Sequence, residues 1–161
     1  MQHALGKWDM VFPPASRYCI QGDGNCQFRA LSWACYGSEC RHAEVRETVC
    51  QYMQQNMDKY KDCMTSSQYV DDMRRQGTFG DQLTLQAFAD SYRTNLLVLD
   101  DDEQATLVQA SRAPKDSKYM TLLFERGNHY NAVSPHDAYA TNILLAQVKE
   151  RMNFENRASF A

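Results

Sequence analysis

A cysteine and a histidine that lie far apart in the sequence carry the side chains best suited to covalent chemistry. Cys26 follows the loop QGDGN and opens CQFRALSWACY, a stretch of good helix formers that ends at Gly37. A helix start favours a thiolate, because unpaired backbone N–H groups point toward it. The same loop offers the N–H groups of Asp23, Gly24 and Cys26 to a developing oxyanion.

His129 is the candidate base for this thiol. It begins an apolar stretch of strand length after the turn Arg126-Gly127-Asn128, and Asn131 follows two residues later. Alternate residues of a strand share a face, so Asn131 can accept a hydrogen bond from one ring nitrogen of His129 and fix its tautomer. A histidine close to Cys26 would favour the thiolate and accept the proton of the thiol.

Both residues also have a plainer interpretation. A cysteine at a helix start is often a core residue beside the cap, and a histidine on a strand is often a surface residue. The other histidines compete poorly for the role of base: His3 lies in an irregular N-terminus, His42 begins a helix among charges and His136 follows a proline. Taken by themselves, these residues leave the catalytic pair a hypothesis.

The segments that must position the pair are helices first and strands later. Two prolines, Pro13 and Pro14, make the first 18 residues irregular. Apolar residues at helical spacing predict helices at about 26–36, 41–56, 66–75, 84–93 and 143–152. Short apolar runs between turns predict strands at about 95–99, 106–110, 119–124 and 129–133. This order indicates an α+β protein with one sheet covered by helices.

The composition narrows the classes of partner. The chain has 161 residues, of which 43% are hydrophobic and 23% charged, and a formal net charge of −3 without any block of Lys or Arg. Nucleic-acid binding therefore has no electrostatic support. No apolar run is long enough for a signal-peptide core or a membrane span. We expect a globular protein of one domain, residues 1–161, with neither nucleic acid nor membrane as a partner.

The six cysteines show no C-x-x-C pair, so we expect no structural zinc site. Without a signal peptide, they indicate a reducing compartment such as the cytoplasm, where thiols stay free. If the protein comes from a pathogen, delivery into a host cell is the corresponding expectation. Most of these cysteines are expected to be small buried hydrophobes.

Four blocks of sequence resemble the ovarian-tumour (OTU) family of cysteine proteases. GDGNCQFRALS at 22–32 is similar to the nucleophile motif of the family, and HAEVR at 42–46 to the start of its second helix. GTFGDQLTLQAFAD at 77–90 resembles its W-G-D-x-x-T-L-x-A segment, and NHYNAV at 128–133 its histidine motif. The blocks follow the order and spacing of the family.

The resemblance implies a papain-like OTU fold with a central, mostly antiparallel sheet flanked by helices. It implies a deubiquitinase that hydrolyses the isopeptide bond after the C-terminal Gly of ubiquitin or a ubiquitin-like modifier, without cofactor or metal. Cys26 is then the nucleophile, His129 the base and Asn131 the third catalytic residue. Asp23, which some accounts count as catalytic, belongs to an oxyanion hole with Gly24 and Cys26. A neutral Asn131 stabilises an imidazolium less than a carboxylate would.

The resemblance also implies a set of substrate-binding residues: Phe79, Gly80, Asp81 and Tyr130. Phe79 stands where the family often has Trp, so it keeps an aromatic wall but lacks an indole N–H. A ubiquitin tail is basic and ends in two glycines, which suits a narrow channel with acidic rims. Asp81, Asp90 and Glu125 are candidates for such rims, and a solvated surface role stays open for each.

The motif-bearing core covers about 17–134 and leaves a C-terminal helical extension at about 140–161 outside the resemblance. Two other classes of function stay open. One is a catalytically inactive OTU-like module that binds ubiquitin without cutting it. The other is a papain-like hydrolase or transferase that acts on a different acyl substrate.

Overall fold

The computed structural model describes residues 17–102, 104–114, 119–133, 145–146, 149–151 and 153. Its α-helices are α1 (Cys26–Tyr36), α2 (His42–Gln55), α3 (Met57–Tyr60), α4 (Tyr69–Arg74) and α5 (Gln82–Tyr92), with short 3-10 helices at η3 (Glu39–Arg41) and η4 (Lys61–Cys63). Its strands are β1 (Arg17–Tyr18), β2 (Asn95–Asp100), β3 (Ala105–Val108), β4 (Tyr119–Glu125) and β5 (His129–Val133).

The strands form a single sheet in the order β1-β5-β4-β2-β3. Only β2 and β4 run parallel, and the other neighbouring pairs are antiparallel. In β4 and β5 the register pairs Glu125 with His129 and Leu123 with Asn131. This confirms the α+β fold and the mostly antiparallel sheet that the sequence predicted.

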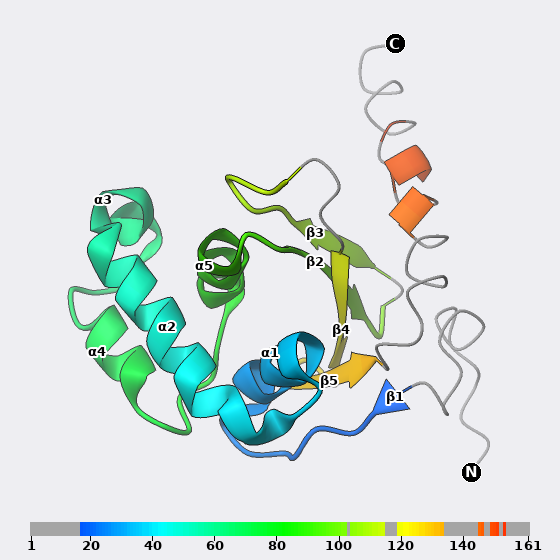
Figure 1. Ribbon diagram of the computed structural model, residues 1–161, viewed down its shortest axis with the longest axis horizontal. Helices are drawn as coiled ribbons and strands as arrows, with labels where there is room; N and C mark the ends of the chain where they lie inside the picture. Colours follow the sequence, from blue (N-terminus) through cyan, green and yellow to red (C-terminus); the bar gives the residue numbers. More distant parts are fainter. Residues whose placement is uncertain are drawn as a thin grey trace.

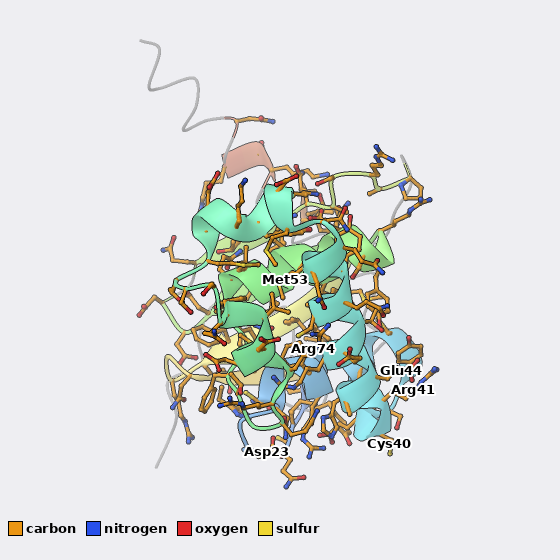
Figure 2. All side chains as sticks on the ribbon, turned by 90° about the vertical axis from the view of Figure 1, so that its left-hand side faces the viewer. Asp23, Cys40, Arg41, Glu44, Met53 and Arg74 are labelled. Carbon is orange, nitrogen blue, oxygen red and sulfur yellow. The ribbon has the colours of Figure 1, made fainter. Side chains whose placement is uncertain are left out.

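Helices α1 to α5 lie on one side of the sheet (Figure 1). Helices α1 and α5 pack against the strands, α2 packs on both of these helices, and α4 packs on α2. Figure 2 shows Arg74 of α4 beside α2, where its guanidinium donates to Gln54 at 2.6 Å. The main core lies in this helical half, and a smaller cluster of Leu97, Leu99, Leu123 and Val133 lies on the opposite side of the sheet.

Local sequence explains why the elements that carry the site begin and end where they do. Helix α1 ends at Gly37, whose φ of 67° is easiest for a residue without Cβ and whose N–H donates to the Trp33 carbonyl. Helix α5 begins with a capping box between Asp81 and Thr84. These signals are local, and both helices match their predicted positions closely.

Some expectations differ from the structure. Strand β1 lies within the first 18 residues, which were expected to be irregular, because Arg17 and Tyr18 pair with Val133 and Ala132 of a distant strand. The short helix α3 was not predicted, and α4 is shorter than the predicted helix at 66–75. Of the helix predicted at 143–152, residues 145, 146 and 149–151 are described and are helical. His3, His136 and most of the C-terminal extension lie outside the described residues.

Asp90 near the end of α5 is a buried structural carboxylate and not the acidic rim that the sequence suggested. Its side chain is 0% exposed and pairs with Lys59 at 2.9 Å. It also accepts hydrogen bonds from Tyr60 at 2.5 Å and from the Ser111 backbone at 2.8 Å. Burial by itself raises the pKa of Asp90, but the hydrogen bonds outweigh it and hold the pKa below its usual value. Asp90 thus joins α3 and the chain after β3 to α5.

We predict that Asp90→Ala lowers the free energy of unfolding at pH 7 by about 3 kcal/mol, because it leaves the partners of a buried carboxylate unsatisfied. Since the pKa of Asp90 is lowered in the folded state, this contribution is present above the unfolded pKa of 3.8 and is lost as the pH falls through the folded value. Urea denaturation at several pH values measures both effects.

The matched control is Asp58→Ala, which removes a carboxylate whose side chain is 99% exposed. It should change the free energy of unfolding by no more than about 0.5 kcal/mol. An Asp90→Ala protein as stable as this control would contradict the structural role of Asp90.

Candidate active site

The thiol of Cys26 lies where the start of α1 meets the turn between β4 and β5. Cys26 is the first residue of α1 and is 2% exposed. Its Sγ donates to the backbone carbonyl of Asn128 at 3.8 Å, and Asn128 is the residue before His129. The fold therefore brings together the cysteine and the histidine motif that the sequence singled out, although 102 positions separate Cys26 from Asn128.

The ring of His129 is held by Asn131, as strand alternation predicted. His129 Nε2 lies 3.1 Å from Asn131 Oδ1. The same oxygen accepts from the Ile20 backbone N–H at 2.9 Å, and Asn131 Nδ2 donates to Glu125 Oε2 at 3.0 Å. Both neighbours fix which end of the amide is oxygen. His129 Nε2 must then carry the hydrogen, which leaves Nδ1 as the basic nitrogen.

Asp23 stabilises the loop that precedes Cys26. Its carboxylate accepts from the Asn25 backbone N–H at 2.9 Å and from Arg29 Nη2 at 2.9 Å. Hydrogen bonding from Arg29 lowers the pKa of Asp23 to about 2, against a smaller opposing effect of burial. The carboxylate is therefore charged at neutral pH, and the hydrogen bonds that it makes with described residues all go to Asn25 and Arg29.

The N–H groups of the loop are less available than the sequence suggested. The Asp23 N–H donates to the Gln21 carbonyl at 3.1 Å, and the Cys26 N–H donates to the Asp23 carbonyl at 3.3 Å. Within the described part of the chain the Gly24 N–H makes no hydrogen bond. Of the three groups expected to receive an oxyanion, Gly24 is therefore the one that is ready in this conformation, while the Cys26 N–H makes only a long bond.

A buried arginine anchors the same loop. Arg46 of α2 is 1% exposed, and its Nη2 donates to Asn25 Oδ1 at 2.8 Å. Its Nη1 donates to the Met73 carbonyl at 2.8 Å, and its guanidinium lies 4.1 Å from the centre of the Phe28 ring. Burial lowers the pKa of Arg46, yet a guanidinium stays charged at any physiological pH. Arg46 thus ties the nucleophile loop to the end of α4.

A second loop, residues 77–81, packs directly on the first. The Gly77 N–H donates to Asn25 Oδ1 at 2.8 Å, and a Cβ on Gly24 would lie only 1.7 Å from the Gly77 carbonyl oxygen. A Cβ on Gly80 would lie 2.2 Å from Gln27 Oε1. Glycine is required at position 24 because the Gly77 backbone leaves no room for a side chain, whereas the neighbour of Gly80 is the end of the Gln27 side chain.

The predicted substrate-binding residues take different positions. Phe79 is 59% exposed on the second loop, and Gly80 beside it is half-buried. Asp81 caps α5 by accepting from the Leu83 and Thr84 N–H groups, and it also accepts from the Tyr69 hydroxyl at 2.7 Å. Its carboxylate therefore serves the fold. Tyr130 is 8% exposed and belongs to the main core, and its contact with substrate stays a prediction.

Several residues that shape the site were not predicted from the sequence. Arg29 and Arg46 lie inside the quoted motifs but received no role, and Gln27 holds the second loop by donating to the Asp81 carbonyl at 3.1 Å. Glu125 was considered only as a rim or surface residue. Residues 125 and 129 flank the turn 126–128 and pair across the hairpin. The position of Glu125 opposite His129 could therefore have been predicted from the sequence.

Comparison with known protein families matches the part of the chain that carries Cys26 and His129. A family model described as "OTU-like cysteine protease" matches residues 21–130. The chain belongs to this family. The match runs from the residue before Gly22 to Tyr130, so it includes Cys26 and His129. It confirms the resemblance of the four sequence blocks.

Two OTU relatives from Arabidopsis thaliana illustrate the similarity. The chain is 37% identical over 117 residues to "OVARIAN TUMOR DOMAIN-containing deubiquitinating enzyme 10", a match that covers 71% of this chain and 33% of the relative. It is 34% identical over 119 residues to enzyme 9 of the same series, and this match covers 72% of this chain and 34% of the relative. The chain thus matches about a third of the length of these relatives.

Solved OTU structures share the fold. The OTU domain of OTUD1 superposes with a TM-score of 0.68 at 21% identity, covering 73% of this chain and 83% of that one. An OTU domain solved in complex with ubiquitin gives a TM-score of 0.62 at 18% identity, and the match covers 75% of this chain and 73% of that one. Because both identities are low, at 21% and 18%, these two structures show that the chain shares the fold and nothing more.

The contact between the two loops leads to a prediction. We expect Gly24→Ala to lower peptidase activity by about 100-fold, because the new Cβ would clash with the Gly77 carbonyl and displace the backbone beside Cys26. Thermal unfolding should show that the core remains folded. Gly22→Ala is the matched control, since a Cβ there meets no atom within 4 Å. Equal activities of the two variants would contradict the importance of the loop contact.

Proposed function

We propose that this chain is a deubiquitinase that hydrolyses the isopeptide bond after the C-terminal Gly of ubiquitin or of a ubiquitin-like modifier. The observation that carries the proposal is the arrangement around Cys26. Its thiol lies at a helix start and donates a hydrogen bond to the carbonyl of Asn128, the residue before His129. The ring of His129 is held in turn by Asn131, with 3.1 Å between Nε2 and Oδ1. This is the arrangement that a cysteine nucleophile and an oriented base require.

In the proposed reaction, His129 Nδ1 takes the proton of Cys26 once the thiol turns from the Asn128 carbonyl toward the ring. The thiolate attacks the carbonyl of the terminal Gly, and the loop N–H groups, led by Gly24, stabilise the oxyanion. His129 then gives the proton to the departing lysine amine. Water, deprotonated by His129, cleaves the thioester and regenerates the Cys26 thiol. These steps need no cofactor.

Ubiquitin as the substrate is supported by the relatives and by the shape of the site. The relatives named above are deubiquitinating enzymes, and one OTU domain of the same fold was solved with ubiquitin. Gly77 has open space where a Cβ would lie, which suits a substrate that ends in glycines, whereas Gly24 and Gly80 are packed against Gly77 and Gln27. Phe79 next to them offers an exposed aromatic wall.

We propose further that residues 1–161 form one catalytic domain, with its core at about 17–134, and that it acts in a reducing compartment such as the cytoplasm, including that of a host cell if the source is a pathogen. All six cysteines are free. Burial raises the pKa of Cys35 and of Cys50 to about 11, so these two thiols stay protonated. Among the described residues, no helix has the length and apolar character needed to cross a membrane.

The proposal predicts that a ubiquitin probe with a C-terminal electrophile labels Cys26 alone. Cys26→Ala and His129→Ala should each lower ubiquitin cleavage by at least about 1,000-fold, because nucleophile and base act as a unit. Asn131→Ala should be milder, since it orients the base without exchanging protons. Cleavage of a fluorogenic ubiquitin amide, together with mass spectrometry of the labelled protein, measures these effects.

The control is His42→Ala, which should cleave ubiquitin at nearly the wild-type rate. A protein that binds the probe without reacting would be an inactive binding module, and one that ignores the probe would be a hydrolase of another acyl substrate. Either result, or substantial cleavage by Cys26→Ala, overturns the proposed function.

Phe79 gives a separate prediction about the substrate. Removing an exposed aromatic ring that contacts the ubiquitin tail should raise KM about tenfold in Phe79→Ala with little change in kcat, because such a contact binds substrate and transition state equally. Tyr36→Ala is the matched control, since Tyr36 is also a partly exposed aromatic residue but lies at the far end of α1 from Cys26. If both variants behave alike, Phe79 does not contact the substrate.

A further inference from the structure

The side chain of Asn131 is held on every polar atom. Its Oδ1 accepts from the Ile20 N–H at 2.9 Å and lies 3.1 Å from His129 Nε2. Its Nδ2 donates to Glu125 Oε2 at 3.0 Å. The other carboxylate oxygen of Glu125 accepts from Arg17 Nη1 at 3.0 Å. A continuous chain of hydrogen bonds therefore runs from β1 through β4 to the catalytic histidine on β5.

This chain supplies something that a cysteine–histidine–asparagine set lacks. An imidazolium forms on His129 when the thiol gives up its proton, and an adjacent carboxylate stabilises that charge better than a neutral amide does. Here the carboxylate lies one residue further away. Glu125 polarises the Asn131 amide, so the amide oxygen that faces His129 becomes more negative. The side chain of Glu125 is 24% exposed, so solvent screens only part of its charge, and Arg17 at 3.0 Å offsets another part of it.

We propose that Glu125 is a positioning residue for the hydrolysis: it fixes the orientation of the Asn131 amide and provides the negative charge behind it. The inference rests on the proposed function. It also gives Arg17 a part, because Arg17 holds Glu125 in place from the opposite side. The simpler interpretation of the Arg17–Glu125 pair as a surface link between strands does not account for the second oxygen of Glu125, which is directed at Asn131.

An exchange of amide and carboxylate separates these interpretations. In Glu125→Gln the new amide faces donors on both sides, Asn131 Nδ2 and Arg17 Nη1, so one contact becomes donor against donor whichever way it turns. In Asn131→Asp the donor Nδ2 is replaced by a carboxylate oxygen. Two carboxylates then lie about as close as Nδ2 and Glu125 Oε2 do in the wild type, and they repel each other. In the double variant every contact is restored. The amide oxygen introduced at position 125 can accept from Arg17, the amide nitrogen there can donate to the carboxylate introduced at position 131, and one negative charge remains.

We expect each single variant to lower kcat for the ubiquitin amide by about 10- to 100-fold with little change in KM. The Glu125→Gln/Asn131→Asp protein should recover most of that loss, which is strong non-additivity. Glu44→Gln is the matched control, because it removes a carboxylate from a surface ion pair with Arg41 at 2.7 Å and should leave kcat unchanged. In Figure 2 Glu44 and Arg41 lie together near the start of α2.

The second readout needs no ubiquitin. Alkylation of Cys26 by iodoacetamide at pH 7, followed by mass spectrometry, should slow in both single variants and recover in the double variant. If the wild type does not cleave ubiquitin but the alkylation pattern holds, the proposed substrate fails and the role of Glu125 stands. Full activity in Glu125→Gln, or losses that simply multiply in the double variant while its melting temperature matches that of the wild type, overturns the role of Glu125.

Discussion

The guanidinium of Arg46 is a buried cation, and the geometry of the site depends on how its charge is accommodated. Among the described residues, no carboxylate lies within ion-pair distance of it. It is stabilised instead by the Asn25 side chain, by the Met73 carbonyl and by the face of Phe28. Because a buried charge is costly without such partners, the surrounding chain is constrained to keep them in place. One partner belongs to the loop before Cys26, one to the end of α4 and one to α1.

One oxygen atom, Asn25 Oδ1, links Arg46 and the loop before Cys26 to the loop 77–81. Asn25 Oδ1 accepts from Arg46 and from the Gly77 N–H, each at 2.8 Å. Asn25 therefore joins the loop before Cys26 to the loop that carries Phe79, and the close contact of Gly24 with Gly77 adds a second link. Two loops from distant parts of the sequence are thus packed against each other beside Cys26.

Local and periodic signals were sufficient for much of this arrangement. Cys26 at a helix start, His129 at the start of β5 and the shared face of His129 and Asn131 all follow from turns, caps and alternation. Other features depend on which chain segment covers which, and the sequence does not state that. Strand β1 exists only through its partner in β5, Tyr130 packs in the main core, and Asp90 is buried by residues distant in sequence. The hydrogen bonds of the Asp23 and Cys26 N–H groups to carbonyls of the same loop do not follow from composition or periodicity.

The edge strand β1 consists of two residues, yet it delivers two of the groups that orient the catalytic base. Arg17 lies in it, and Ile20, whose N–H donates to Asn131, lies two residues after Tyr18 at its end. Short edge segments open more readily than a core does, so their protection against amide hydrogen exchange is low compared with that of a central strand. Opening of β1 would release Asn131 while the helices and the rest of the sheet stay folded. If β1 opens before the rest of the sheet, the orientation of His129 depends on the local stability of this strand and not on the global stability of the domain.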